Sequence, residues 1–305
     1  MSPFKKQSSL GKFRIIGLLT ALPIFLFSCH TAIAPGPNGT ETPSLSPAPS
    51  PSPSASPSAS QSPSASPAQT LARRVVALYY VGKTEEGFRL YREFRSIPVG
   101  SDVGLSSLQF LTKAPSKALD GDYFNLWGNG SIINSVSYSG DKATVDLLVV
   151  PLNVGSESEA RAIDQLVWTL TANHPSTKYV SFTSDGKQFE SFAGHVDARQ
   201  AFSRELAYEV LAPVWVNQVS QIMSNPVIMR GTACTFEAGL HWQLFRNGEM
   251  IREGSAVASG ACPIRGAWSV ELGTLRQGEY VFAAQDVSAK DGSITQEDTK
   301  EFSIK

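Results

Sequence analysis

The sequence predicts two folded domains in succession, an α+β domain over residues 72–212 and an all-β sandwich over residues 213–305. In the first of these stretches, strand-like runs are interspersed with helix-period segments, which is typical of helices packed on a sheet. The second holds about seven short alternating runs separated by turn residues, with no convincing helix among them. Residues 35–70 consist almost entirely of Pro, Ser and Ala, so we place folded structure only after them.

The α+β domain is expected to open on a hairpin. Residues 75–81 form a nearly continuous apolar run, and turn residues separate it from a mixed run at 88–94. Asp102 can then cap a helix whose leucines recur at i, i+3 and i+6 and which ends before Ala114 and Pro115. A loop that contains Trp127 follows this helix.

A second hairpin and a longer helix are expected next. Residues 132–138 and 143–149 alternate in polarity around a Gly-Asp turn. The helix begins at Ser156, where Glu159 completes a capping box, and ends before His174 and Pro175. Residues 179–183 and 189–192 then read as strands around another turn. We expect one sheet with at least two helices on it.

The sandwich is predicted from runs of alternating polarity. These runs lie at 227–234, 240–245, 250–253, 268–272, 280–284 and 301–304. The Asn247-Gly248 pair is a strong hairpin signal, and Trp242 and Trp268 fall at core positions of their runs. Cys234 and Cys262 are the two cysteines of this domain, and we expect them to form a disulfide in an exported protein.

Both domains resemble a known family. The residues at 131–136, 140–147, 165–171, 180–182 and 185–186 occur in the order seen in the GerM domain of sporulation and spore-germination lipoproteins. The second domain resembles the immunoglobulin-like domain that often follows GerM; the matching stretches are 224–227, 231–233, 236–238, 246–249, 278–280 and the turn at 291–292. The resemblance implies an envelope protein of sporulation, germination or envelope assembly, and self-association as one mode of action.

The N-terminal residues predict export and lipidation. Residues 1–28 contain four basic and no acidic residues, and an apolar run from 15 to 27 leads to Ser28-Cys29. This resembles a bacterial lipobox, in which the cysteine is acylated after cleavage. An apolar run of about 13 residues is too short to span a bilayer as a helix. We expect residues 1–28 to be a signal peptide and Cys29 to be the lipid attachment site on the outer face of the cell membrane.

The segment from 29 to 71 is expected to be an unfolded tether, whose composition favours extended polyproline-like conformations. Without residues 1–28 the chain has 22 basic against 27 acidic residues. Such a mildly acidic chain gives no basic field for nucleic acid, and we expect no nucleic-acid partner.

No catalytic signature is present in the sequence. The four histidines and three cysteines show none of the common zinc spacings, and neither a nucleophile elbow nor a phosphate-binding loop occurs. We therefore expect no catalytic residue, no metal and no cofactor. Asp120 and Asp122, in an aromatic loop with Tyr123 and Trp127, are the most suggestive group for ligand contact. Trp127 lies among Gly and Asn, where exposure is easier, and it is the single residue that we favour for a binding contact.

Two functions remain open at this level. The first is a non-catalytic, membrane-anchored lipoprotein that contacts envelope proteins or peptidoglycan. The alternative is a peptidoglycan- or polysaccharide-binding module that assists cell-wall hydrolases. An enzyme acting on the wall is the third and least supported possibility.

Overall fold

The computed structural model describes residues 71–113, 116–128, 130–217 and 219–305. The predicted signal peptide, Cys29 and the tether lie outside the described residues. Two apolar cores are present, one from Val76 to Trp215 and the other from Val214 to Ile304, so they meet at residues 214 and 215. No helix in the described part of the chain is both long and apolar enough to cross a bilayer.

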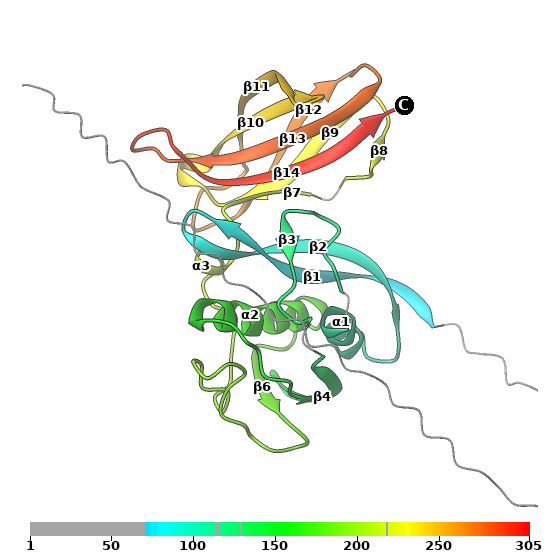
Figure 1. The fold of residues 1–305 in the computed structure, drawn as a ribbon, viewed down its shortest axis with the longest axis vertical. Coiled ribbons are helices and arrows are strands. Elements are labelled where there is room, and N and C mark those ends of the chain that lie inside the picture. Colours follow the sequence, from blue (N-terminus) through cyan, green and yellow to red (C-terminus); the bar gives the residue numbers. More distant parts are fainter. Residues whose placement is uncertain (1–70, 114–115, 129, 218) are drawn as a thin grey trace, which may run out of the picture. The chain divides into compact units, whose positions relative to one another are not determined.

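The first domain contains two separate sheets with helices between them (Figure 1). One sheet has the order β2-β1-β3, and the other has the order β4-β5-β6. Helix α1 contacts strands of both sheets. The elements are β1 (Ala72–Thr84), β2 (Gly87–Val99), α1 (Val103–Thr112), β3 (Tyr123–Phe124), β4 (Ile132–Ser139), β5 (Lys142–Leu148), α2 (Ser156–Asn173) and β6 (Tyr179–Thr183). The α+β class is confirmed, but the prediction of a single sheet is wrong.

Both predicted hairpins and both predicted helices form. β1 pairs with β2, and β4 with β5, each pair antiparallel. The side chain of Asp102 caps α1 by accepting a bond from the N–H of Leu105 at 3.0 Å. Helix α2 ends at His174, before Pro175, because the residue preceding a proline is biased away from helical geometry.

The predicted capping box at the start of α2 is wrong. The N-cap is Gly155, which has no side chain to offer, and Glu159 points into the domain instead. The carboxylate of Glu159 is fully buried and accepts bonds from the side chain of Ser191 at 2.6 Å and from four backbone N–H groups of residues 192–196 at 2.8–3.1 Å.

Residues 189–192 do not form the predicted strand. They belong to the loop that Glu159 holds, and β6 pairs instead with β5 in parallel. A parallel partner needs a long crossover, and α2 provides it. In so short a segment, the sequence pattern of a strand is the same as that of a loop whose apolar side chains point into the core. Phe192 is such a side chain.

A polar stripe on α2 binds the free edge of β1. Gln165, Thr169 and Asn173 lie four residues apart, so they share one face of the helix. Asn173 bonds both the N–H and the C=O of Ala77 at 3.1 and 2.7 Å. Thr169 accepts from the N–H of Tyr79 at 3.2 Å, and Gln165 donates to its carbonyl at 2.9 Å. These side chains pair backbone groups that a neighbouring strand would otherwise have to pair.

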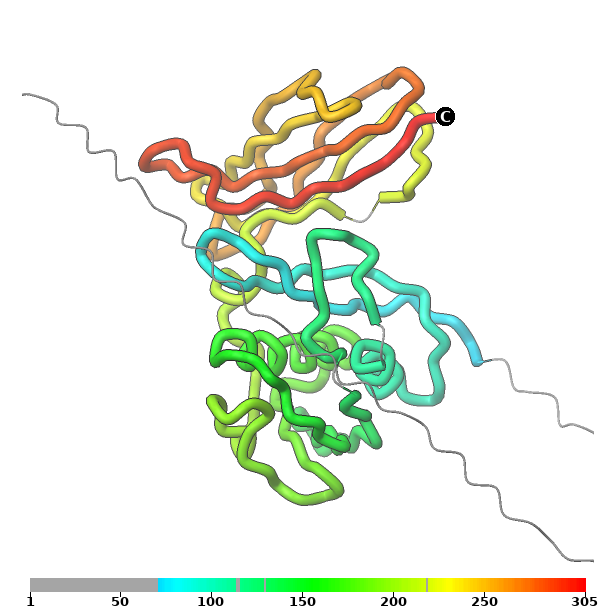
Figure 2. The backbone as a smooth tube through the Cα atoms, in the orientation of Figure 1, coloured from blue at the N-terminus to red at the C-terminus, as the bar shows by residue number. Residues whose placement is uncertain are grey.

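The second domain is a β-sandwich, as predicted. A five-stranded sheet of order β11-β10-β13-β14-β8 faces a three-stranded sheet of order β12-β9-β7. The elements are α3 (Ala207–Val210), β7 (Val214–Val216), β8 (Ile222–Met223), β9 (Val227–Ala233), η1 (Phe236–Ala238), β10 (Gly239–Arg246), β11 (Glu249–Val257), β12 (Gly266–Gly273), β13 (Gly278–Val287) and β14 (Ile294–Ile304). The backbone passes from the first domain to the second through α3 and β7 (Figure 2).

The predicted details of the sandwich are confirmed. Trp242 and Trp268 are buried, and both rings stack on Phe282. Asn247 and Gly248 turn between β10 and β11 with positive φ angles of 52° and 81°, the geometry for which this residue pair is favoured. Cys234 and Cys262 form the expected disulfide, which joins the end of β9 to the loop before β12.

Candidate functional site at the domain junction

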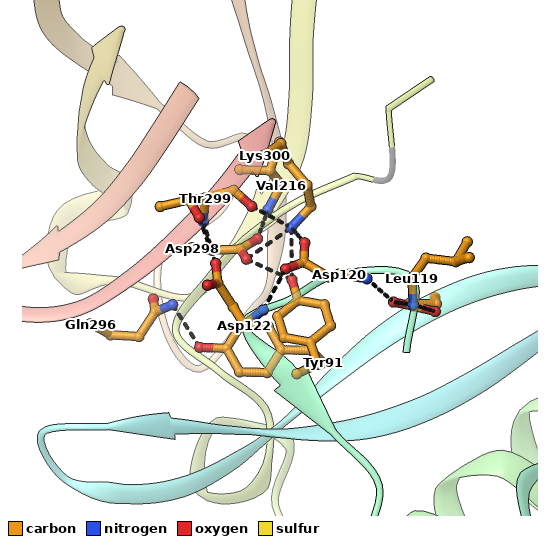
Figure 3. A network of polar contacts seen from close by, with 11 residues as sticks. Tyr91, Leu119, Asp120, Asp122, Val216, Gln296, Asp298, Thr299 and Lys300 are labelled. Carbon is orange, nitrogen blue, oxygen red and sulfur yellow. Dashed lines mark hydrogen bonds and ion pairs between the residues drawn. The ribbon is translucent and has the colours of Figure 1, made fainter. Parts of the chain in front are cut away.

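A buried polar cluster joins the two domains (Figure 3). The second domain contributes the inward face of β14, where Gln296, Asp298 and Lys300 occupy alternate, buried positions. The first domain contributes Tyr91 from β2, Tyr123 from β3, and the preceding loop with Asp120 and Asp122. We call this set the junction cluster.

Lys300 is the centre of the junction cluster. Its Nζ lies 2.9 Å from the Oδ1 atom of Asp298 and 2.9 Å from the hydroxyl oxygen of Tyr123, and it also forms an ion pair with Asp120. The hydroxyl of Tyr123 in turn donates to Oδ1 of Asp298 at 2.6 Å. The lysine is therefore held by one carboxylate from each domain.

The electrostatics of the pair follow from burial. Burial raises the pKa of Asp298 to about 6, although Lys300, Tyr123 and the N–H of Val216 all favour the anion. For Lys300, burial alone would lower the pKa, but Asp298 and Asp120 more than offset it and the pKa is raised. Near pH 7 Asp298 and Lys300 are both charged, so they form a buried ion pair within β14, and Lys300 forms its ion pair across the junction with Asp120.

Further bonds surround this pair. The outer carboxylate, Asp122, accepts from the hydroxyl of Thr299 at 2.6 Å and from its N–H at 3.2 Å. On the inner side, Gln296 donates to the hydroxyl of Tyr91 at 2.8 Å. The rings of Tyr91 and Tyr123 stack at 4.3 Å between centroids. The junction is therefore sealed by both polar and aromatic contacts.

The same side chains of β14 hold strand β7, by which the chain enters the sandwich. Gln296 accepts from the N–H of Val214 at 3.0 Å, and Oδ2 of Asp298 accepts from the N–H of Val216. Each of these two side chains thus binds the first domain with one atom and the linking strand with another. Domain placement and the path of the link are coupled through them.

Glu93 fixes the loop that supplies Asp120. This glutamate of β2 is buried and accepts from the N–H of Leu119 at 2.8 Å and from the N–H of Asp120 at 3.1 Å. Arg95 lies 3.1 Å from it and balances its charge. Glu93 thus acts on the junction indirectly, through the backbone of residues 119 and 120.

The carboxylates of the junction cluster are matched to an internal cation. One oxygen from each of Asp120, Asp122 and Asp298 lies within 4.8 Å of the others, a spacing that could also suit a metal ion. However, the ammonium of Lys300 already bonds Asp120 and Asp298.

A groove of about 690 Å³ runs beside the cluster and is lined in part by Glu93, Ile222 and Phe302.

The prediction that Trp127 is an exposed ligand contact is wrong. Its side chain has no exposed surface, and its ring nitrogen donates to the carbonyl of Ala162 in α2 at 2.8 Å. The ring also meets Phe192 edge-on at 5.3 Å. The neighbouring glycines suggested exposure, but the indole lies in the core of the first domain.

Asp120 and Asp122 lie together, as their spacing predicts, but they face the second domain. Oδ2 of Asp120 contacts Lys300, and Oδ2 of Asp122 accepts from Thr299. His195 and Arg204 form no ion pair across the junction with any described residue; the N–H of His195 donates to Glu159, and Arg204 donates to Thr171.

Lys300 and Asp298 were missed by sequence reasoning, whereas Tyr123 lies in the aromatic loop that it singled out. A signal for the first two exists, because Gln296, Asp298 and Lys300 are in phase with the core residues Phe302 and Ile304 along β14. Polar residues at inward positions of a strand indicate either a buried network or a contact with another surface. The sequence alone places the strand only at 301–304.

Comparison with known families agrees with this architecture. Residues 77–190 match the model of the Germane family, described as sporulation and spore germination, and residues 207–293 match Gmad2, described as the immunoglobulin-like domain of bacterial spore germination. The chain therefore contains a Germane domain followed by a Gmad2 domain. Its Germane domain contains Asp120 and Tyr123, whereas β14 with Lys300 follows the matched part of the Gmad2 domain.

Solved structures of low similarity cover part of the chain. The tandem GerMN domains of the sporulation protein GerM from Bacillus subtilis are 18% identical over 47% of this chain and 48% of that one, with a TM-score of 0.34. The first of those domains alone is 20% identical over 43% of this chain and 98% of that one, with a TM-score of 0.33. A candidate lipoprotein of Clostridium perfringens is 21% identical over 46% and 93%, with a TM-score of 0.31.

This chain thus covers about half of the tandem GerM structure. No curated protein matches the sequence. The Germane description names sporulation and spore germination, the Gmad2 description names spore germination alone, and neither describes an enzyme.

Proposed function

We propose that this protein is a non-catalytic, lipid-anchored lipoprotein of the cell envelope that acts in sporulation or germination by contacting other envelope proteins. The observation that carries this proposal is the junction cluster, which makes the Germane and Gmad2 domains one compact unit. In this cluster the titratable groups bind one another across the domains. That arrangement suits a rigid body that presents surfaces at a defined spacing.

The anchoring half of the proposal rests on the sequence. The residues that precede Cys29 resemble a lipobox, and the Pro- and Ser-rich tether of residues 29–71 would carry the two domains away from the bilayer. A double acyl anchor holds a protein on a membrane where a single chain would hold it only marginally. The membrane partner is therefore the lipid-modified N-terminus rather than a basic surface.

Anchoring is tested with Cys29→Ala in cells. The unmodified protein is expected in the membrane fraction and, after metabolic labelling, to carry labelled fatty acid. The variant is expected to lose the label and to leave the membrane fraction. Cys234→Ala serves as the matched control, because it removes a cysteine of the sandwich and should leave the label in place. Membrane retention and labelling of Cys29→Ala would sink the lipoprotein assignment.

The partner class is tested by crosslinking in intact cells and by sedimentation with purified peptidoglycan sacculi. We expect crosslinks to envelope proteins, self-association among them, and no retention on sacculi. Retention on sacculi would favour the alternative, a wall-binding module that assists hydrolases. Under that alternative Trp127 was the expected glycan contact, and the burial of this residue removes that support for wall binding. Clearing of wall substrate by the purified protein would overturn the non-catalytic assignment.

A further inference from the structure

Three arginines near the link between the domains lack an acidic partner. They are Arg92 of β2, Arg204 in the segment before α3, and Arg265 in the loop before β12. Arg89, Arg95, Arg161 and Arg199 form ion pairs with carboxylates, whereas these three form none with any described carboxylate. Several other arginines, such as Arg252, also form none, so what sets these three apart is that they lie together.

Aromatic rings hold these three arginines in place. The guanidinium carbon of Arg265 lies 4.1 Å from the ring centroid of Trp215. That of Arg92 lies 5.6 Å from the same ring and 4.7 Å from the ring of Phe94. The guanidinium of Arg204 lies 4.4 Å from the ring of Trp168. We call Arg92, Arg204, Arg265, Trp168 and Trp215 the arginine–aromatic cluster.

The two halves of the arginine–aromatic cluster meet on the β1–β2 hairpin. The ring of Trp168 contacts the ring of Tyr79 at 5.5 Å, and Tyr79 is the cross-strand partner of Arg92. Directly paired residues of an antiparallel ladder place their side chains on the same face. The arginines are thus close enough for their charges to interact: burial and the charge of Arg92 lower the pKa of both Arg204 and Arg265.

Arg92 has donors to spare. Within the described residues it forms cation–π contacts but no hydrogen bond, and its Nε is buried without a partner. In contrast, Nε of Arg204 donates to the hydroxyl of Thr171 at 2.7 Å, and the terminal nitrogens of Arg265 donate to backbone carbonyls such as that of Ala212. A guanidinium offers five N–H donors in a planar fork that matches a carboxylate. The fork of Arg92 is therefore preorganised and unused.

The surroundings favour a protein segment as the ligand. Phe94, whose ring lies against the guanidinium of Arg92, is 51% exposed. The groove beside the junction cluster, which Arg92 also lines, is not part of the proposed site, because its charged lining is mainly acidic: Glu93, Asp120, Asp122, Glu279 and Glu301. Leu206 and Tyr208, at the start of α3 beside β2, are 55% and 43% exposed. Arginine, tyrosine and tryptophan are the residues most enriched where proteins bind one another tightly.

The positive charge of the three arginines favours a partner of negative charge. Residues 71–305 hold 22 basic against 26 acidic residues, so three adjacent arginines without acids are a positive site in an acidic protein. Like charges held together cost free energy, and an anion that binds between them relieves it. A basic or neutral segment would gain nothing from these groups.

We propose that the arginine–aromatic cluster binds the carboxylates of an acidic protein segment, with the guanidinium of Arg92 as the central donor and the exposed apolar residues beside it as the rim. This inference deepens the proposed function by naming the class of envelope partner. It does not depend on the lipid anchor, because the site lies wholly within the folded domains.

The test uses the purified full-length protein in detergent and a fluorescein-labelled hexaglutamate peptide, with fluorescence anisotropy as the readout. Labelled hexaglutamine is the uncharged control. We expect hexaglutamate to bind and hexaglutamine not to bind at the same concentrations. Affinity should fall steeply between low and moderate salt, as expected of a charge-dominated contact.

Variants then locate the site. Arg92→Gln and Arg204→Gln should each weaken hexaglutamate binding about 10-fold, the usual effect of losing one charge-assisted bond. Arg199→Gln is the matched control, because Arg199 is exposed and already paired with Asp197, and it should bind as the unmodified protein does. Arg92→Lys keeps the charge but loses the fork, so an intermediate affinity is expected. Thermal melts confirm that each variant is folded.

Three outcomes would overturn the proposal. The first is that hexaglutamate binds no better than hexaglutamine. The second is that Arg92→Gln and Arg204→Gln, folded by thermal melt, bind hexaglutamate as tightly as Arg199→Gln does. The third is displacement of the peptide by low-millimolar inorganic phosphate, which would show a site for small anions instead. None of these bears on Cys29→Ala, so failure here leaves the anchoring proposal standing.

Discussion

A buried carboxylate of the Germane domain, Glu159, and one at the junction, Asp298, have pKa values that are shifted in opposite directions. Glu159 in the Germane domain meets only neutral donors, and its pKa is lowered because bonds from Ser191 and several backbone N–H groups outweigh the burial that would raise it. Asp298 at the junction meets a full positive charge, yet burial raises its pKa to about 6.

The difference teaches that the number and placement of donors decide the outcome. Five N–H and O–H groups converge on Glu159, one of the arrangements that lower a carboxylate pKa most. The ammonium of Lys300 interacts with both Asp298 and Asp120, so Asp298 is not its only partner and its anion is stabilised less. Glu159 shapes a loop within one domain, whereas Asp298 fastens two domains together.

The largest expected effect comes from removing the cation at the junction. Lys300→Met leaves Asp298 and Asp120 buried without their shared charge, and it should cost about 3–5 kcal/mol of unfolding free energy at pH 7. Urea denaturation measures this loss, with Lys305→Met, at an exposed lysine, as the control. If the two variants are equally stable, the ion pair does not fasten the domains.

The pH dependence at Asp298 should be the next largest effect. A folded-state pKa of about 6, above the ordinary 3.8, gives a contribution to stability that is full below pH 4 and is lost as pH rises through 6. The unmodified protein should therefore lose about 2–3 kcal/mol relative to Asp298→Asn between pH 4 and pH 7. Urea midpoints at several pH values check this, and a pH-independent difference between the two proteins would contradict it.

Glu159→Gln tests the other side of the comparison. The amide keeps one acceptor but turns a donor toward backbone N–H groups, so we expect a loss of about 1–3 kcal/mol at pH 7. Because the pKa of Glu159 is lowered, its contribution is present above pH 4.5 and is lost as pH falls through the folded-state pKa. The deficit of the variant should thus shrink in acid. Glu190→Gln, on the exposed part of the same loop, is the control.

The smallest effect should come from the outer rim of the junction. Asp122 is exposed, and its bonds to Thr299 compete with water, so Asp122→Asn is expected to cost less than about 1 kcal/mol. Thermal melting at low and high salt measures the change. A loss as large as that of Lys300→Met would mean that the rim, rather than the buried pair, sets the strength of the junction.

Local patterns were sufficient for most elements of the fold. The cap at Asp102, the stop before Pro175 and the Asn247-Gly248 turn each depend on residues within a few positions, and each is confirmed. The spacing of apolar residues likewise gave the alternation of the sandwich. The disulfide followed from cysteine count and the expectation of export.

The features that sequence reasoning missed all depend on distant residues. Glu159 has the spacing of a capping box, but the backbone of residues 192–196 offers it more donors than Ser156 could. Trp127 lies among glycines, but α2 and Phe192 enclose it. Lys300 and Asp120 are 180 residues apart in the sequence, and no local rule pairs them.

The polar stripe of α2 limits how copies of this protein can assemble. Gln165, Thr169 and Asn173 occupy the backbone groups of Ala77 and Tyr79 that face away from β2. Joining two copies into a continuous sheet along this stretch of β1 would require α2 to leave the core that it helps to build. Any ring or filament of this protein must therefore grow through side-chain surfaces or through other strands, with the β1 edge already closed by its own helix.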